Sequence, residues 1–225
     1  AQFIDNYGWE KPKWFSNNKE KENYSYRRNN SFNYVKNECE NVYNNVGLLD
    51  LSTFAKYEIS GRNSEQFLER LCANKIPQQE GSIILTHMLN EKGRIQTELT
   101  ITRFPNNNFY VLSSTASEFR DLDWFLKHKN KDEHVNIQNI TNDYGVLVLA
   151  GPKSREVLSK LTNEDLSNEN FPWLKAKEIN IAGMQVKALR INYIGELGWE
   201  LHHSFKDMEN LYDQLMSAGK RYNIS

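Results

Sequence analysis

Side chains capable of binding and proton chemistry gather in one short motif near the end of the chain, residues 190–201 (RINYIGELGWEL). The motif predicts a strand, a tight turn and a second strand, and its two glycines let the backbone turn where a Cβ would clash. The carboxylates of Glu196 and Glu200, the phenol of Tyr193 and the indole of Trp199 surround this turn. Such a set suits a flat ligand that forms hydrogen bonds. A purely structural turn with aromatic neighbours is the alternative interpretation.

A further carboxylate, Glu98, lies in the predicted strand 95–101 (IQTELTI), which alternates between apolar and polar residues. Glu98 is expected on the same face as Gln96 and Thr100, because successive side chains of a strand point to opposite faces. Residues 90–93 (NEKG) just before it predict a hairpin turn. Glu98 therefore lies a few residues along a hairpin arm, either on a solvated sheet face or in a site.

The remaining candidates for chemistry have weaker patterns. His202 and His203 are adjacent on a predicted strand, so their side chains point to opposite faces and cannot both bind one metal ion. The two cysteines, Cys39 and Cys72, lack CxxC spacing, which argues against a zinc site and a disulfide framework. His87 is expected to line a site or the core. No Gly-x-Gly-x-x-Gly follows an early strand, so no flavin or nicotinamide site is expected in this chain.

The composition indicates a folded domain. The 225 residues are 39% hydrophobic, which suits one large domain or two small ones with a substantial core. A formal net charge of −1 offers no general attraction for nucleic acid, and no apolar run reaches the length of a membrane span, so neither partner is expected. The few cysteines favour a reducing compartment, and we expect a cytoplasmic protein, or one of the mitochondrial matrix if the organism is eukaryotic.

Residues 1–46 are expected to form an extended N-terminal arm that lies across the rest of the chain. The sequence GWEKPKWF holds Trp9, Trp14 and Phe15 around a proline that fixes an extended backbone, so we expect these rings to be buried against the domain. A flexible tail is the alternative, and three large aromatic residues argue against it. The apolar spacing in residues 33–45 predicts a short helix at the end of the arm.

Beyond residue 47 the chain contains an internal repeat. Residues 56–64 (KYEISGRNS) and 145–154 (GVLVLAGPKS) each predict a strand that ends at a glycine, and a helix with one apolar face follows each of them. Each copy continues through three strands to a second helix, expected at 82–89, 95–103, 109–113 and 116–128 in the first copy and at 178–181, 184–191, 199–203 and 206–218 in the second. The expected fold class is therefore α+β, with duplicated βαβ-rich halves.

Four motifs occur in a fixed order along the chain: GLLDLS at 47–52, MLNEKGR at 88–94 followed by ELT, LAGP at 149–152, and YIGELGWE at 193–200. Their order and spacing resemble the folate-binding T-protein (aminomethyltransferase) family. The phrases GWEKPKWF, TELTI and GELGWEL are most similar to the tetrahydrofolate region that follows the flavin domain in dimethylglycine and sarcosine dehydrogenases. The resemblance implies a folate-binding domain over residues 47–225, and a C-terminal part of the family domain is expected after residue 225.

The resemblance also implies a set of site residues. Glu98 matches an acidic residue near the reacting nitrogens of the pteridine, where most T-proteins have Asp, and it is the expected proton acceptor. Tyr193 and Glu200 match positions that contact the pterin, and a carboxylate suits that ring because it can accept two parallel N–H bonds. Phe54 matches a position that packs on the pterin, and Ser114 stands where many T-proteins have Asn.

The function implied by the resemblance is tetrahydrofolate-dependent transfer of a methylene unit from an oxidised N-methylated glycine. FAD and the oxidation of the amine would then belong to a separate flavoprotein domain or subunit, and no metal is required. Alternatives are a glycine cleavage aminomethyltransferase, a folate-dependent demethylase, and a regulatory subunit that has kept the fold and lost the chemistry. The segment that completes the folate site in the family is expected after residue 225, so the site within these residues is expected to be incomplete.

Overall fold

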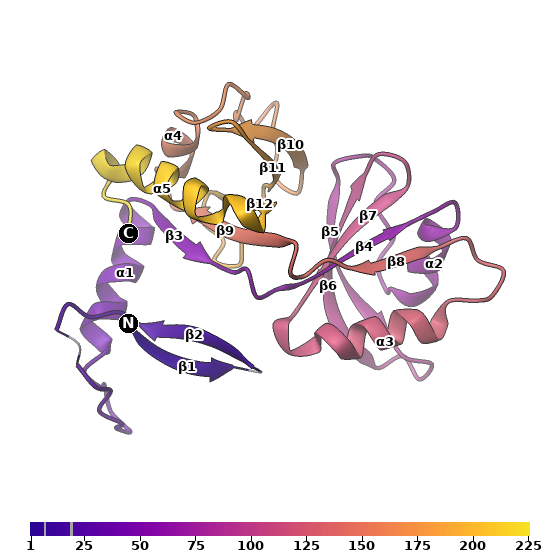
Figure 1. Ribbon diagram of the computed structural model, residues 1–225, viewed down its shortest axis with the longest axis horizontal. Coiled ribbons are helices and arrows are strands. Elements are labelled where there is room, and N and C mark those ends of the chain that lie inside the picture. Colours follow the sequence, from indigo (N-terminus) through magenta and orange to yellow (C-terminus); the bar gives the residue numbers. More distant parts are fainter. Residues whose placement is uncertain (7, 19) are drawn as a thin grey trace.

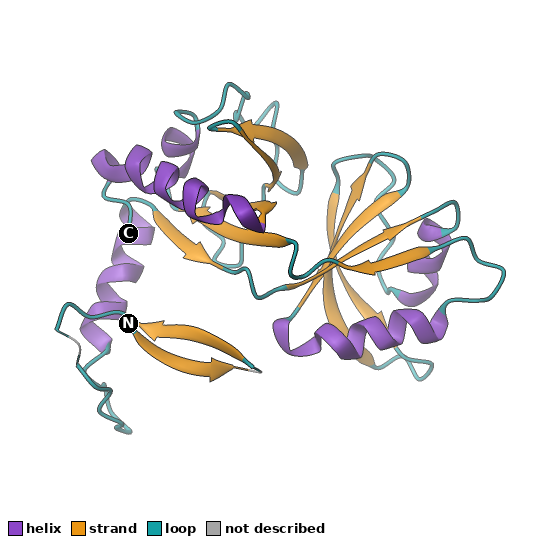
Figure 2. Cartoon of the chain, in the orientation of Figure 1, coloured by secondary structure: helices purple, strands orange, loops and turns teal. Residues whose placement is uncertain are grey.

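The computed structural model describes residues 1–6, 8–18 and 20–225 (Figure 1). Two five-stranded antiparallel sheets form the body of the molecule, and helices cover one face of each (Figures 1 and 2). An N-terminal β-hairpin and one helix lie beside the second sheet. Among the described residues, no helix combines the length and the apolar character that crossing a membrane requires.

The first sheet has the strand order β5-β6-β7-β4-β8. Its elements are β4 (Ala55–Ser60), α2 (Ser64–Leu71), β5 (Ile83–Leu89), β6 (Ile95–Phe104), β7 (Asn108–Ser113), the 3₁₀ turn η1 (Thr115–Ser117), α3 (Glu118–His128) and β8 (Asn136–Asn139). Helices α2 and α3 pack on one face through Phe67 and Phe125, whose rings lie in one buried cluster with Tyr57 of β4.

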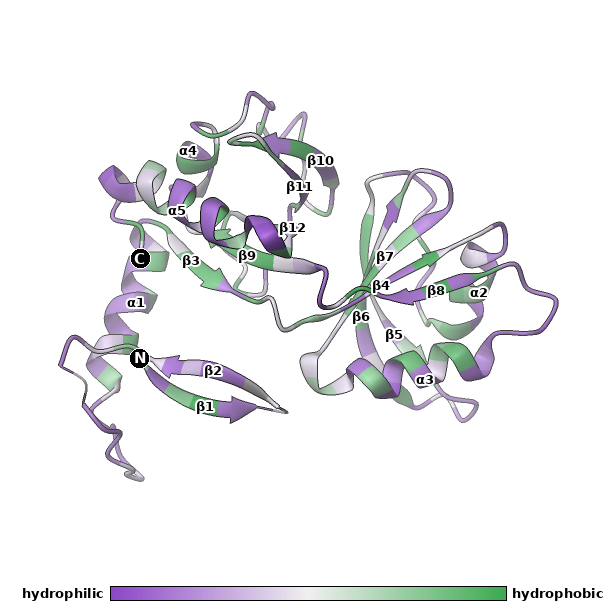
Figure 3. Ribbon diagram, viewed as in Figure 1, coloured by the Kyte–Doolittle hydropathy of each residue, from purple (hydrophilic) through white to green (hydrophobic). Residues whose placement is uncertain are grey.

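The second sheet has the strand order β10-β11-β12-β9-β3. Its elements are β3 (Gly47–Asp50), β9 (Tyr144–Ala150), α4 (Ser154–Leu158), β10 (Ala176–Ile181), β11 (Met184–Leu189), β12 (Gly198–Ser204), the turns η2 (Phe205–Asp207) and η3 (Lys220–Tyr222), and α5 (Met208–Gly219) between those turns. Strand β9 is apolar along most of its length (Figure 3) and is buried on both faces, as expected for a central strand. Helices α4 and α5 cover one face.

The two sheets confirm the internal repeat. Each repeat contributes a strand, a helix, three strands and a second helix, and the four strands take the same order in both sheets. The fifth strand of each sheet comes from outside that pattern: β3 precedes the first repeat but pairs with β9, and β8 pairs with β4. The α+β class with duplicated halves is therefore correct, and the predicted strands and helices are present with ends that differ by a few residues.

The N-terminal segment differs from the expected arm. Strands β1 (Gln2–Asn6) and β2 (Trp9–Trp14) form a hairpin, and α1 (Phe32–Asn44) is the predicted helix. Trp14 is buried, with its ring centroid 5.5 Å from that of Tyr34 in α1, so it packs within the N-terminal segment. Phe15 is 54% exposed, and the expectation that its ring is buried was wrong. The side chain of Trp9 lies outside the described part of the structure, and the boundary at residue 46 stays a prediction.

The two sheets turn their helix-free faces toward each other. A buried apolar cluster joins them, formed by Ile83, Phe104, Tyr110 and Leu112 from the first sheet and by Ala176, Leu189 and Ile191 from the second sheet and its following loop. Two backbone hydrogen bonds at the edges, from Ala176 N to Gly81 O and from Ile83 N to Leu174 O, continue the contact. The surface between the sheets is thus part of the core and also the place where side chains from both repeats meet.

Candidate functional site

Glu98 lies on β6, on the face of the first sheet opposite α2 and α3. Its neighbours Thr97 and Leu99 are buried on the helix-covered side, which confirms the predicted alternation. The Glu98 side chain is 59% exposed, and Oε2 lies 3.6 Å from Nε2 of His87, the residue opposite it on β5. Glu98 is therefore an accessible carboxylate beside an imidazole that can hold or exchange a proton.

Two further predicted residues fall in the same row of the sheet. Continuing the registers of β4–β7 and β6–β7 past their last pairs sets Phe54 and Ser114 in line with Glu98 and His87. Phe54 is partly buried just before β4, and Ser114 is exposed just after β7. The structure thus brings three of the five predicted site residues together at one end of the first sheet.

Glu200 lies on β12 and is almost wholly buried, with 6% of its surface exposed. Its Oε2 is 3.2 Å from Nε2 of His202, two residues further along the same face. Nδ1 of His202 is 3.0 Å from the hydroxyl of Tyr110, which belongs to the first sheet. Burial lowers the pKa of His202, although its hydrogen bond to Glu200 acts in the opposite direction. At neutral pH the ring is therefore uncharged.

Glu98 and Glu200 lie on the faces that the two sheets turn toward each other. Thr102, four residues from Glu98 on the same face of β6, pairs with Tyr110, and Tyr110 contacts His202 beside Glu200. Four residues of strand correspond to about 13 Å, so a ligand that touches both carboxylates has to be extended.

Tyr193 lies in the loop between β11 and β12 and is 89% exposed. The Asn192 side chain holds this loop: its Oδ1 accepts the N–H groups of Ile194 at 3.1 Å and Gly195 at 3.0 Å, and its Nδ2 donates to the Glu196 carbonyl at 2.7 Å. The phenol is therefore presented on a turn that side-chain hydrogen bonds stabilise. Among the described residues its hydroxyl has no hydrogen bond, so none joins it to Glu98 or Glu200.

Trp199 does not line a ligand site, contrary to the sequence interpretation. Its ring is wholly buried in the cluster beneath α4 and α5, with its centroid 6.1 Å from that of Phe171. The reason is the alternation of the strand, because a carboxylate at 200 on the inner face sends the indole at 199 to the helix-covered face.

Lys56 is a feature that sequence reasoning missed. It is fully buried, and Nζ donates to three backbone carbonyls: Ser52 at 2.8 Å, Phe54 at 2.9 Å and Thr141 at 3.1 Å. Burial lowers the pKa of Lys56 to about 8, against the attraction of nearby carboxylates. The ammonium group fixes the segment that carries Phe54 and joins it to the chain that leads into the second repeat.

The role of His202 was also missed, although His202 and His203 do point to opposite faces as predicted. His203 packs away from the inter-sheet surface, with Nδ1 3.0 Å from the Leu201 carbonyl. The i, i+2 spacing of Glu200 and His202 on a strand was the available signal. Tyr110 offered none, because it lies 92 residues away in sequence.

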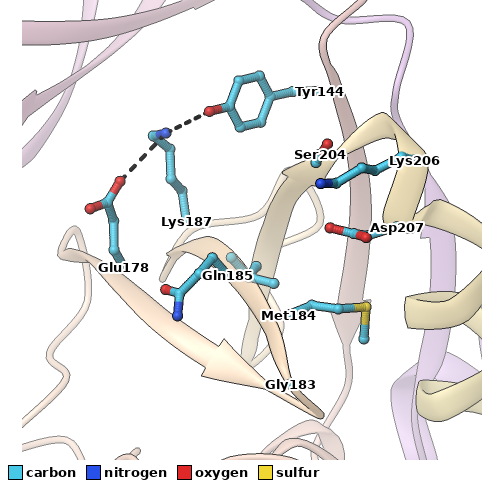
Figure 4. A pocket seen from close by; sticks show the side chains of 10 residues that line it. Tyr144, Glu178, Gly183, Met184, Gln185, Lys187, Ser204, Lys206 and Asp207 are labelled. Atoms are coloured by element: carbon cyan, nitrogen blue, oxygen red, sulfur yellow. Dashed lines mark hydrogen bonds and ion pairs between the residues drawn. The ribbon is translucent and has the colours of Figure 1, made fainter.

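A cavity of about 540 Å³ lies against β10, β11 and η2 (Figure 4), and its residue Lys187 is the cross-strand neighbour of His202. The Lys187 side chain contacts two other residues that line this cavity, with Nζ 3.0 Å from the Tyr144 hydroxyl and 3.4 Å from Oε1 of Glu178. None of the five predicted site residues lines this cavity. In the described parts of the chain, no group of three or more His, Cys, Asp or Glu side chains is placed to hold a metal ion.

Comparisons with known proteins agree with this architecture. The family model described as "GCVT N-terminal domain" matches residues 1–225. Over 220 residues, 96% of this chain, the sequence is 44% identical to dimethylglycine dehydrogenase, mitochondrial, from Mus musculus and 42% identical to the Homo sapiens protein. The chain spans about a quarter of the length of these curated relatives, 25% of each.

Two solved structures share the fold at low sequence identity. The glycine cleavage system aminomethyltransferase T from Bartonella henselae superposes with a TM-score of 0.80 at 19% identity, covering 100% of this chain and 55% of that one. A chain of the heterotetrameric sarcosine oxidase from Corynebacterium sp. U-96 gives a TM-score of 0.65 at 16% identity, covering 80% of this chain and 86% of that one. These structures support the fold.

Proposed function

The chain belongs to the GCVT N-terminal domain family, and on that basis we propose that it binds a reduced folate between its two sheets and takes part in transferring a one-carbon unit to it. The observation that carries this proposal is the pair of carboxylates, Glu98 and Glu200, on facing sheet surfaces of a chain 42–44% identical to dimethylglycine dehydrogenases. The donor in that case is an N-methylated glycine, oxidised by a flavin-containing domain or subunit outside this chain.

The residues present fit such a ligand. Glu200 has His202 as its one side-chain hydrogen-bond partner among the described residues, and each carboxylate oxygen can accept more than one hydrogen bond. Glu200 can therefore still receive the paired N–H donors of a pterin ring. Phe54 supplies an apolar side chain in the row of Glu98, and Tyr193 supplies an exposed ring on a stabilised loop.

Each carboxylate has a distinct task in this proposal. Bound tetrahydrofolate would supply the nucleophilic nitrogen that accepts the one-carbon unit. Glu98 would take up the proton released at that nitrogen, and His87, 3.6 Å away, would steady the carboxylate or pass the proton on to solvent. Glu200 would hold the far end of the ring and so orient the nitrogen toward Glu98.

Calorimetric titration with folinic acid, a stable reduced folate, tests the binding. We expect the full-length protein to bind, and Glu200→Gln to weaken binding about tenfold or more, because it removes the charged acceptor of the N–H donors. Glu178→Gln is the matched control, since Glu178 lines the cavity of Figure 4 on β10, two strands away from Glu200 on β12. If Glu178→Gln weakens binding and Glu200→Gln does not, the ligand lies in that cavity and the site is misplaced.

The transfer step is tested with Glu98→Gln in the full-length protein during dimethylglycine oxidation. Glu98→Gln is expected to abolish formation of methylene-folate while folinic acid binding stays within a few fold, because the amide cannot accept the proton. Unchanged transfer would refute the role of Glu98. Absence of folate binding by the full-length protein would instead favour a regulatory relative without catalysis.

A further inference from the structure

A chain of hydrogen bonds crosses from one sheet to the other and ends on Glu200. It runs from the Tyr110 hydroxyl to Nδ1 of His202 at 3.0 Å and from Nε2 of His202 to Oε2 of Glu200 at 3.2 Å. The rings of Tyr110 and His202 meet edge to face, with centroids 5.3 Å apart and planes at 90°. Tyr110 and His202 have almost no contact with solvent.

The number of protons on these groups fixes which atom donates and which accepts in each hydrogen bond. The pKa of His202 is lowered by burial, so its neutral ring has one N–H. An ionised carboxylate only accepts hydrogen bonds, so the His202 proton lies on Nε2 and Nδ1 is an acceptor. The Tyr110 O–H must then donate to Nδ1, and burial raises the pKa of Tyr110 well above its ordinary value, which keeps that proton in place.

Nearby polar groups do not compete for Glu200. Lys56, a buried cation whose charge acts on His202, is held by three backbone carbonyls. The Tyr144 ring meets that of Tyr110 edge to face, with centroids 6.2 Å apart and planes at 63°. Its hydroxyl accepts a hydrogen bond from Lys187, the cross-strand neighbour of His202, and Glu178 also pairs with that lysine. In the described part of the chain, the orientation of the Glu200 carboxylate therefore depends on His202, and the His202 tautomer depends on Tyr110.

We infer that Tyr110 and His202 are positioning residues, which lock the Glu200 carboxylate in the orientation that receives the ring of the folate. This inference rests on the proposed function, since it assigns a task within the same site. Neither residue needs to touch the ligand. Because Tyr110 comes from the first repeat and Glu200 from the second, contact between the two sheets sets the geometry of the binding group.

Folinic acid titration of four variants tests the positioning role. Tyr110→Phe is expected to weaken binding about three- to tenfold, the effect of one hydrogen bond, because His202 can then place its proton on Nδ1 and turn a lone pair toward Glu200. His202→Leu is expected to weaken binding at least as much, and His202→Gln to restore part of it, since an amide both donates and accepts. Tyr144→Phe is the control and is expected to leave the dissociation constant unchanged.

A double-mutant cycle separates positioning from general stability. If Tyr110 acts through Glu200, Tyr110→Phe loses its effect on binding when Glu200 is already Gln. An equal loss in both backgrounds would overturn the inference while leaving the folate site intact. Absence of binding by the unaltered protein would overturn the proposed function, and the positioning role with it.

Nitrogen NMR of the histidine ring provides a readout that needs no folate. In the free protein we expect His202 to be neutral with its proton on Nε2, and Tyr110→Phe to shift population toward the Nδ1 tautomer. A proton on Nδ1 in the unaltered protein would refute the hydrogen-bond chain, whatever the binding data show.

Discussion

Asn168 joins two arginines that have no carboxylate partner in the described residues. Arg155 and Arg190 both donate to its Oδ1, at 2.7 Å and 2.6 Å, and both guanidinium groups lie over the Trp199 ring, 5.9 Å and 5.7 Å from its centroid. Burial lowers the pKa of Arg190, and the positive charge of Arg155 adds to that effect. One neutral oxygen therefore holds together two cations that repel each other.

Asn168→Asp is expected to stabilise the protein by about 0.5–1 kcal/mol, because a carboxylate bonds more strongly than an amide to two guanidinium groups and the site is partly exposed. Urea denaturation at low and high salt measures the change, and the gain should shrink at high salt. Asn163→Asp, at another exposed position, is the control and should not stabilise. No gain at low salt would contradict this reading of the arginine pair.

Which individual residues could be foreseen from the sequence depended on whether the determining contact was local. The alternation around Glu98 was visible in the sequence and is confirmed. The same alternation places Trp199 and Glu200 on opposite sides of β12. It does not say which residue is on the helix-covered side, because that depends on the packing of α4 and α5 from elsewhere in the chain. Lys56 and Tyr110 act through partners 85 and 92 residues away, and no spacing rule reveals such contacts.

The fifth strand joins each sheet beside a glycine that occupies the equivalent position in both repeats. Gly61 and Gly151 end the first strand of each repeat with φ of +119° and +127°, and a Cβ at either would meet a backbone carbonyl, that of His134 or Asn45. Those two carbonyls lie just before β8 and β3, and they accept the N–H groups of Asn63 and Lys153. Each glycine thus marks the place where the fifth strand enters its sheet.

Gly151→Ala is expected to destabilise the fold by about 2–4 kcal/mol, from left-handed backbone strain plus overpacking. The added Cβ would lie 2.6 Å from Asn45 O and 2.7 Å from Val42 O. Gly183→Ala is the matched control, because its φ of +89° is also positive but a Cβ there meets nothing within 4 Å. It should cost only about 1–2 kcal/mol. If Gly151→Ala and Gly183→Ala unfold at the same urea concentration, the backbone at Gly151 tolerates a side chain and the prediction is wrong.

At the level of elements, the repeat made most of the fold predictable. Strand-ending glycines and helical spacing located both copies, since those signals are local. Strands β3 and β8 were not foreseen, because each has four residues and the sequence of β8, NIQN, is mainly polar. Strand β3 pairs with the first strand of the second repeat, and β8 pairs with β4 across two helices and three strands of the chain, so only the assembled sheets define them.

In the whole molecule, two buried histidines lie on opposite faces of the second sheet. His202 faces the first sheet, while His203 faces the start of α5, with Nε2 3.0 Å from the Met208 sulfur. Burial lowers the pKa of both, more than their hydrogen-bond partners raise it. Protonation of both histidines would therefore place a positive charge on each side of the second sheet. The charge on His202 would also be repelled by the Lys56 ammonium group.

Stability is therefore expected to fall as the pH drops below about 6.5, the ordinary pKa of histidine in an unfolded chain. Below that pH the two histidines bind protons in the unfolded chain but stay neutral in the folded protein, so the free energy of unfolding decreases until the pH reaches their lower folded pKa values. Above about pH 7.5 both histidines are neutral in both states, so they do not make the free energy of unfolding depend on pH. Two protons correspond to at most about 2.7 kcal/mol per pH unit.

Urea denaturation between pH 8 and 5 measures this dependence of the free energy of unfolding on pH. His203→Gln should reduce it, while His134→Gln, at an exposed position, should not. A flat profile from pH 7 to 5 would mean that the folded protein accommodates both charges, and the sheets would then have to separate locally without loss of the fold.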